Sequence, residues 1–145
     1  MAGPGDAPTV TLHATTIALD GRAALIRGAS GRGKSALALQ LIALGAVLVA
    51  DDRTLVTREG TRLIARAPNA IAGRIEARGV GILAAPTVPE ADIELLIDLD
   101  RDEPARLPDT KTGKILGLSR PELGNIGAGH FPAAILLYLR HGRIA

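Results

Sequence analysis

The sequence contains no cysteine and almost no aromatic residues. Among its 145 residues there is no Trp, one Tyr and one Phe. Without Cys, the chain cannot form a disulfide, a thiolate nucleophile or a zinc site with Cys ligands. The near absence of aromatic rings argues against a nucleic-acid partner bound by base stacking. The hydrophobic core must therefore be built from Ala, Val, Leu and Ile, which supply most of the 47% hydrophobic residues.

The sequence also lacks a strong charge of one sign. Its 17 basic and 15 acidic residues give a net charge of +2, and the basic residues form no concentrated stripe. A basic stripe is the usual electrostatic footprint of a nucleic-acid-binding protein. We therefore expect no nucleic-acid partner.

Long hydrophobic runs are missing too. The longest, Ala36–Ala50, is interrupted by Gln40 and Gly45 and is too short to span a membrane. Residues 1–7 are small and uncharged apart from Asp6, so we expect no signal peptide there. We therefore predict a single domain over residues 1–145, with a loose tail over residues 1–8, a cytoplasmic location and no membrane contact.

Residues 28–35 read Gly-Ala-Ser-Gly-Arg-Gly-Lys-Ser and match the phosphate-binding P-loop pattern G-x-x-x-x-G-K-[ST]. A predicted buried strand, Ala23–Ile26, precedes the motif, and a predicted helix, Ala36–Leu44, follows it. The glycines let successive N–H groups face one anion, and the helix N-terminus adds its positive dipole end. The alternative is a glycine-rich turn that matches by chance. The predicted nucleotide-binding residues are Gly28, Ala29, Ser30, Gly31, Arg32, Gly33, Lys34 and Ser35.

In such a loop, two side chains have defined partners. Lys34 would reach the β- and γ-phosphates, and the Ser35 hydroxyl would bind Mg²⁺.

The remaining pattern predicts a chain rich in short strands. Residues 101–117 are polar and rich in turn formers, which predicts a mobile surface loop. Residues 133–139 fit either a helix or a strand. The other predicted strands are Thr9–His13, Thr15–Leu19, Ala46–Ala50, Thr54–Thr57, Arg62–Ala65, Val80–Leu83 and Ile93–Leu99, and a short helix is possible within Pro68–Arg74.

Two adjacent carboxylates, Asp51 and Asp52, follow the apolar run at residues 46–50. In an open α/β sheet, such a strand end lies in the crevice beside the P-loop. Phosphoryl transfer needs a metal and a group that takes or gives a proton. One aspartate would serve the metal and the other would be free to act as a base. The alternative is that the pair only begins a turn toward Arg53.

Two further features admit both a functional and a structural interpretation. The segment Ile75–Ile82 places Glu76 and Arg78 two residues apart, on one side of an extended strand. Gly79 and Gly81 leave bare backbone that suits close approach by a ligand. The structural alternative is an exposed edge strand with an internal ion pair. His13, in turn, stands near a strand end, where a lone histidine is usually structural.

Taken in order, these motifs resemble one known family. His13, the P-loop, Val-Ala-Asp-Asp at 49–52 and Ile-Glu-Ala-Arg-Gly-Val-Gly-Ile at 75–82 resemble the catalytic domain of HPr kinase/phosphorylase. The Glu-x-Arg-Gly-x-Gly element is characteristic of that family, and the resemblance covers residues 13–106. The chain resembles the short, single-domain form of proteobacteria. The resemblance implies an α/β P-loop kinase domain related to phosphoenolpyruvate carboxykinase.

The resemblance also implies an activity. That activity is ATP-dependent, Mg²⁺-assisted phosphorylation of a serine on an HPr-type phosphocarrier protein. The resemblance also implies a hexamer, since members of the family form hexamers. Longer members also run the reverse reaction, in which inorganic phosphate attacks phosphoserine and releases pyrophosphate.

Residue roles follow from the same resemblance. Asp52 matches the general base, with Asp51 beside it. Ser35 and Glu76 match Mg²⁺ ligands. The remaining residues carried over as catalytic are His13, Lys34, Arg78 and Arg106.

One family element is missing. The family carries a Gly-Arg-Asn loop linked to dephosphorylation, and the sequence has none. Ser119–Pro121 or Gly124–Gly129 are the segments that could replace it, so the reverse reaction stays open.

Two other functions also stay open. One is a nucleotide-binding regulatory module without efficient transfer. The other is a small-molecule kinase, which is disfavoured because almost no aromatic side chains are available for an organic substrate pocket.

Overall fold

The structure is a computed structural model that describes residues 7–145. Most of the expected tail, residues 1–6, lies outside this range. Pro8 belongs to the fold, because its carbonyl accepts a hydrogen bond of 2.9 Å from the Arg58 N–H.

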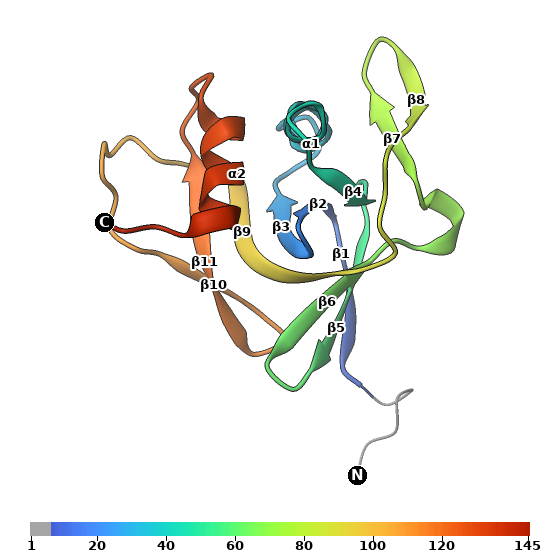
Figure 1. Cartoon of the computed structure of the whole chain (residues 1–145), viewed down its shortest axis with the longest axis horizontal. Coiled ribbons are helices and arrows are strands. Elements are labelled where there is room, and N and C mark those ends of the chain that lie inside the picture. The colour runs from blue at the N-terminus through green and yellow to red at the C-terminus, as the bar shows by residue number, and fades with distance from the viewer. Residues whose placement is uncertain (1–6) are drawn as a thin grey trace.

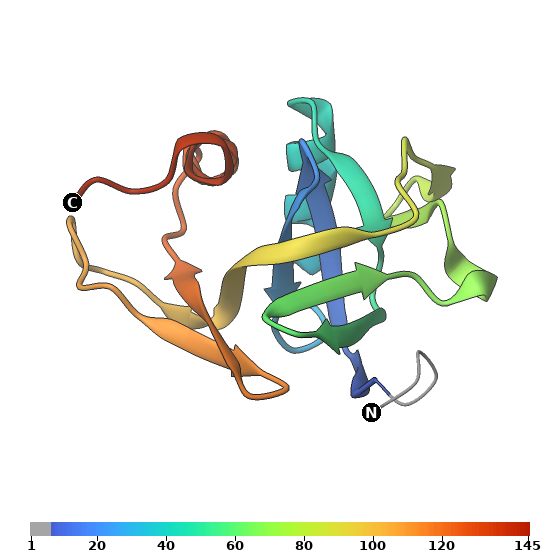
Figure 2. The same cartoon turned by 60° about the horizontal axis from the view of Figure 1, so that its bottom comes forward.

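One curved sheet of nine strands dominates the molecule, and two helices lie on the same face of it (Figure 1). The strand order is β1-β5-β6-β9-β3-β2-β4, and β11 and β10 extend the sheet from β9. A separate hairpin, β7–β8, projects at the opposite end of the molecule from β10 and β11 (Figures 1 and 2). The helices are α1 (Lys34–Ala43) and α2 (Phe131–His141), and a single 3-10 turn covers Asn69–Ile71. The strands are β1 (Thr9–Leu12), β2 (Ala14–Leu19), β3 (Arg22–Arg27), β4 (Val47–Ala50), β5 (Thr54–Glu59), β6 (Arg62–Arg66), β7 (Arg74–Ala77), β8 (Gly81–Ala84), β9 (Ala91–Asp102), β10 (Thr112–Ile115) and β11 (Leu118–Asn125).

Two hydrophobic cores lie on the two faces of the central strands. On β3, Ile26 packs into the core under α1 and α2, and Leu25 packs into the core shared with β5 and β6. Successive side chains of a strand point to opposite faces, so the central strands are apolar throughout because both faces are covered. The long strand β9 crosses the molecule (Figure 2). It pairs with β3, β6 and β11 and so connects the central strands to the β10–β11 end of the sheet.

The sheet topology brings the two predicted site segments to the same edge. Strands β3 and β4 both pair antiparallel with β2, so they run in the same direction. Residue Gly28 follows β3 and residue Asp51 follows β4. The P-loop and the aspartate pair therefore emerge side by side.

The structure decides or corrects several expectations for the second half of the chain. The expected loop over residues 101–117 is wrong in part: β9 continues to Asp102 and β10 occupies Thr112–Ile115. Strand β11 was not predicted, because its sequence contains Pro121 and Gly124, which weaken a strand pattern. The ambiguous segment 133–139 is helical. Its buried residues Phe131, Ile135 and Leu139 recur every four positions and form one helical face.

Within the described residues, no helix is long and apolar enough to cross a membrane.

Candidate active site

The P-loop forms a compact turn between β3 and α1. Gly31 and Gly33 have φ angles of 84° and 97°, in the left-handed region where a side chain is strained. Gly33 is also the N-cap residue of α1, and no side chain caps this helix end. The first N–H groups of a helix have no partner within the helix, so the start of α1 can bind an anion.

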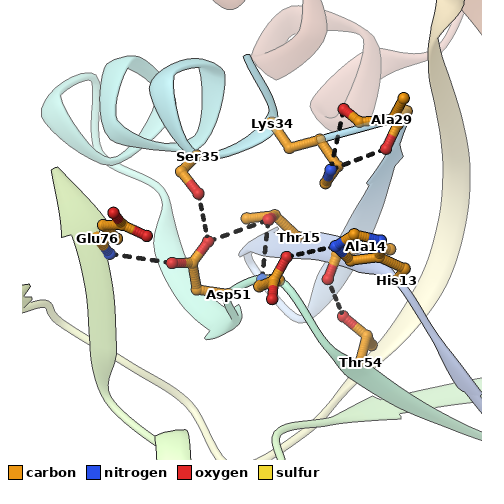
Figure 3. A network of polar contacts seen from close by, with 11 residues as sticks. His13, Ala14, Thr15, Ala29, Lys34, Ser35, Asp51, Thr54 and Glu76 are labelled. Carbon is orange, nitrogen blue, oxygen red and sulfur yellow. Dashed lines mark hydrogen bonds and ion pairs between the residues drawn. The ribbon is translucent and has the colours of Figure 1, made fainter. Parts of the chain in front are cut away.

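Lys34 is almost fully buried beneath the loop, with 6% exposure. Its ammonium group donates hydrogen bonds to the carbonyls of Gly28 at 2.8 Å and Ala29 at 3.3 Å (Figure 3). These are neutral acceptors, and no ion pair to Lys34 is present among residues 7–145. The positive charge therefore remains uncompensated beside the loop, where a phosphate group would neutralise it.

Asp51 is the buried member of the aspartate pair and holds three elements together (Figure 3). Its Oδ1 accepts hydrogen bonds from the hydroxyls of Ser35 at 2.6 Å and Thr15 at 3.0 Å. Its Oδ2 accepts a hydrogen bond of 3.0 Å from the Glu76 N–H. Asp51 thereby connects the P-loop helix, strand β2 and hairpin β7–β8.

Asp52 points the other way and contacts His13. The Nε2 atom of His13 lies 2.6 Å from Oδ1 of Asp52, and the two side chains are 53% and 60% exposed. Asp52 has a φ angle of 64°, a left-handed conformation that aspartate tolerates better than most residues. This turn aims the second carboxylate away from Ser35 and toward solvent. A carboxylate can only accept hydrogen bonds, so His13 donates and orients Asp52.

Thr15 is a site residue that the sequence motifs do not indicate. Its hydroxyl donates to Asp51 and accepts a hydrogen bond of 3.1 Å from the Asp52 N–H. Thr15 thus holds the carboxylate of Asp51 and the backbone of Asp52 at once. Nothing in the sequence marks it, because a threonine in a strand is common.

The motifs do not indicate Asp100 either. Its carboxylate accepts the Ala29 N–H at 2.9 Å and lies 3.2 Å from the Arg32 Nε. Strand β9 pairs parallel with β3, so its carboxyl end lies beside the P-loop. The placement of site residues at parallel strand ends could have indicated this residue.

The oxygen atoms near Ser35 are of the kind that bind a magnesium ion. The Ser35 hydroxyl and the Asp51 carboxylate are in contact, and Glu76, whose N–H binds Asp51, has an exposed side chain on β7. No group of three or more His, Cys, Asp or Glu side chains that could hold a metal occurs in the described part of the chain. Magnesium prefers oxygen ligands and usually keeps several waters and substrate phosphates beside one or two carboxylates. The residues present therefore fit Mg²⁺ bound together with a nucleotide.

Glu76 and Arg78 do not lie on one face of a strand, contrary to expectation. Strand β7 ends at Ala77, and Arg78 lies in the exposed turn before β8. Across residues 7–145, no hydrogen bond or ion pair joins Arg78 to the aspartates or the P-loop.

Arg106 lies apart from the other candidates. It is exposed on the irregular segment between β9 and β10, and no polar contact ties it to the site within the described range.

The two segments that could replace the missing Gly-Arg-Asn loop differ in position. Ser119–Pro121 lies within β11, where Arg120 donates to the carbonyls of Ile93 at 2.8 Å and Thr61 at 2.6 Å, which is a structural role. Residues 127–129 instead line a cavity beside the P-loop.

Two open cavities meet at Asp52. One, of about 490 Å³, is lined by His13, Ser30 and Asp52. The other, of about 390 Å³, is lined by Asp51, Asp52 and Glu76. A phosphate held by the loop would thus lie between a metal-binding side and a side with a solvent-facing carboxylate.

Comparison with known proteins points to the family that the sequence motifs resemble. The HPr Serine kinase C-terminal domain family matches residues 6–110. The HPr kinase/phosphorylase of Alkaliphilus metalliredigens is 41% identical over 102 residues, which cover 65% of this chain and 33% of the relative. That of Geobacillus thermodenitrificans is 36% identical over 130 residues, which cover 81% of this chain and 42% of the relative. This chain thus spans only about a third to two fifths of these relatives.

A solved structure covers far more of the chain. The Hpr(Ser) kinase/phosphatase from Coxiella burnetii superposes with a TM-score of 0.76 at 30% identity, over 90% of this chain and 94% of that one. The fold is therefore the α/β fold of that enzyme, as the sequence predicted. On the strength of the family match and this likeness, the chain belongs to the HPr serine kinase C-terminal domain family.

Proposed function

We propose that this chain transfers the γ-phosphoryl group of ATP to a serine of an HPr-type phosphocarrier protein. The observation that carries the proposal is the solvent-facing Asp52–His13 pair next to the P-loop. A buried base would suit a small substrate, whereas an exposed base can receive a hydroxyl presented by another protein. The named relatives support the same reaction class.

The residues divide the proposed reaction among them. Asp52 takes the proton of the serine hydroxyl while the serine oxygen attacks the γ-phosphorus of ATP. The bond between the γ-phosphorus and the ADP oxygen then breaks. His13 holds Asp52 in position. Lys34 and the loop N–H groups stabilise the phosphate charge, and Ser35 with Glu76 would hold Mg²⁺ near Asp51. The metal supplies charge neutralisation on the phosphates.

Arg78 and Arg106 are proposed as further catalytic residues. The family resemblance alone supports them, since neither makes a hydrogen bond or ion pair with the site within residues 7–145. Arg106 would stabilise charge on the transferring phosphoryl group. In the reverse reaction an oxygen of inorganic phosphate would attack the phosphorus of phosphoserine to form pyrophosphate, and the departing serine oxygen would take its proton from Asp52.

The test is a transfer assay with labelled ATP, Mg²⁺ and a purified HPr-type carrier. We expect label on the carrier that survives acid and that mass spectrometry assigns to serine. Label on histidine, or no transfer to any HPr-type carrier of the same organism, would refute the kinase. ATP binding without transfer would support the second candidate, a nucleotide-binding regulatory module.

We also propose that copies of the chain associate, as the resemblance to a hexameric family implies. The support is the hairpin β7–β8, where Val80 and Ile82 are 76% and 73% exposed. Exposed apolar side chains that lie close together commonly mark protein interfaces. Light scattering on Val80→Asp and Ile82→Asp variants should show smaller particles than the unchanged chain, and equal masses would refute this interface.

A further inference from the structure

We propose that the cavity between the first turns of α1 and α2 holds the nucleoside part of the triphosphate, with Arg32 as one wall. This inference rests on the proposed ATP-dependent function and adds where base and ribose bind. The cavity measures about 440 Å³. This volume falls within the range of small-molecule sites, about 300–1,000 Å³.

The cavity touches the P-loop at the end opposite the proposed chemistry. Ser30, early in the loop, lines the cavity of His13 and Asp52. Gly33 and Ala36, late in the loop and in the first turn of α1, line this cavity instead. If the γ-phosphate faces Asp52 and the other phosphates follow the loop, the α-phosphate lies near Gly33. The nucleoside is therefore delivered to this cavity.

The guanidinium group of Arg32 is fixed at the wall of the cavity. Its Nε lies 3.2 Å from an Asp100 oxygen, and its Nη2 donates to the Leu99 carbonyl at 3.1 Å. The Asp100 carboxylate partly neutralises Arg32, which makes it a weak partner for phosphate. A fixed, planar guanidinium group is well suited to stacking on an aromatic base.

The other walls combine apolar side chains, bare backbone and two amide side chains, Gln40 and Asn125. Leu99 and Phe131 line the cavity as the outermost atoms of the core, with 4% and 7% exposure, and Phe131 is one of only two aromatic residues in the chain. The Asn125 amide also lines the cavity, but its oxygen already accepts the Gly127 N–H at 3.0 Å. The base would thus stack on Arg32 and contact the edge of the apolar core, with the Gln40 amide as the polar group on the α1 side.

The test separates nucleoside binding from phosphate binding. Calorimetry in the presence of Mg²⁺ would compare ATP with tripolyphosphate, which has the phosphates and no nucleoside. The variant Ala36→Leu places a larger side chain in the cavity from an exposed helix position. The matched control is Ala43→Leu, which makes the same change at the exposed far end of α1. Leu and Ala are both good helix formers, so both variants should keep the helix.

We expect Ala36→Leu to weaken ATP binding by about tenfold or more. Its tripolyphosphate affinity and both affinities of Ala43→Leu should stay unchanged. Unchanged ATP affinity in Ala36→Leu, or equal loss for both ligands, would overturn the nucleoside site while leaving the phosphate site intact. No tripolyphosphate binding by the unchanged chain would instead refute the proposed P-loop function, and the inference with it.

A second measurement needs no variant. Nuclear Overhauser contacts from the adenine protons to the Phe131 ring and the Leu99 methyl groups are expected in the unchanged chain with ATP. Contacts to the methyl groups of Ile71 or Ile82, which line the cavity of Asp51 and Glu76, would overturn the proposal.

Discussion

Asp51 forms the floor of the candidate site and Asp52 forms its rim. These two neighbouring residues differ in burial and in the number of hydrogen bonds that their carboxylates accept. At the floor, Asp51 is 7% exposed and its carboxylate accepts three hydrogen bonds. At the rim, the Asp52 side chain is 60% exposed and contacts one side chain, His13. A buried carboxylate with its hydrogen bonds satisfied is held in one geometry. The floor is therefore prepared before any ligand arrives, whereas the rim stays open to a macromolecule.

This difference predicts that floor and rim variants fail in different ways. Floor variants should impair binding of nucleotide or metal, and rim variants should impair the transfer step alone. The predictions below test this division, from the largest expected effect to the smallest.

Replacing Lys34 with Ala should have the largest effect. The change removes the ammonium group beneath the P-loop, so transfer should fall below detection and ATP affinity should fall as well. Removing one group that stabilises transition-state charge typically costs about 10²–10³-fold in rate, and here the loss of binding adds to it. Calorimetry and the transfer assay measure the two effects, with circular dichroism as the check on folding. Normal transfer in a folded Lys34→Ala variant would contradict the site assignment.

Replacing Asp52 with Asn should separate rate from binding. The amide keeps the size of the side chain but cannot take the serine proton, and a general base contributes about 10²–10⁴-fold to rate. ATP affinity should change little because Asp52 lies at the rim. Single-turnover transfer and calorimetry are the two measurements.

The matched variant for Asp52→Asn is Asp51→Asn. At the floor, this change exchanges an acceptor for a donor facing the Ser35 or Glu76 donors, and such a mismatch costs about 1–3 kcal/mol of stability. Thermal unfolding should therefore show a lower Tm for Asp51→Asn than for Asp52→Asn. If Asp51→Asn kept its stability and lost only transfer while Asp52→Asn stayed active, the two roles would be exchanged.

Replacing Glu76 with Gln should shift the magnesium requirement. The Glu76 N–H that binds Asp51 is retained, so the floor should keep its geometry and lose one negative charge. We expect half-maximal transfer to need a higher Mg²⁺ concentration, with the rate at saturating Mg²⁺ less affected. An unchanged Mg²⁺ titration would return the hairpin to a purely structural role.

A carboxylate outside the site should affect stability alone. Lys111 donates to Glu103 at 3.0 Å and, as the main cause, holds the pKa of Glu103 below its ordinary value of 4.5. A lowered folded-state pKa stabilises the fold above the unfolded pKa, and this contribution is lost as the pH falls through the folded pKa. Glu103→Gln should therefore have a slightly lower Tm than the unchanged chain at pH 7.

The Tm gap between Glu103→Gln and the unchanged chain should close on acidification below about pH 4.5. Glu94→Gln, at an exposed position of β9, is the control and should show no such pH-dependent gap. Any change of ATP affinity in Glu103→Gln would contradict a purely structural role.

Local sequence signals predicted the first half of the fold well. The P-loop, its preceding strand and its helix were expected from glycine spacing and hydrophobic pattern, and each is present. Strand β11 was missed because Pro121 and Gly124 disrupt the pattern. Pro121 is tolerated in β11, and Gly124 has no room for a side chain, since an added Cβ would lie 2.7 Å from the Arg101 carbonyl oxygen. Only the packing of distant segments makes these residues fit a strand.

The sequence by itself determined which chemical groups are available: a phosphate-binding loop, a paired carboxylate, and no thiol or aromatic cluster. The tertiary structure decided which carboxylate is buried and which is exposed. That decision comes from the left-handed turn at Asp52 and from Thr15, which lies 36 positions before Asp51 in the chain and bonds to it. The tertiary structure also decided that the Glu76 backbone binds Asp51, whereas in the described part of the chain no polar contact joins Arg78 or Arg106 to it. Contacts between distant residues depend on strand direction and register, and no local pattern of residues encodes them.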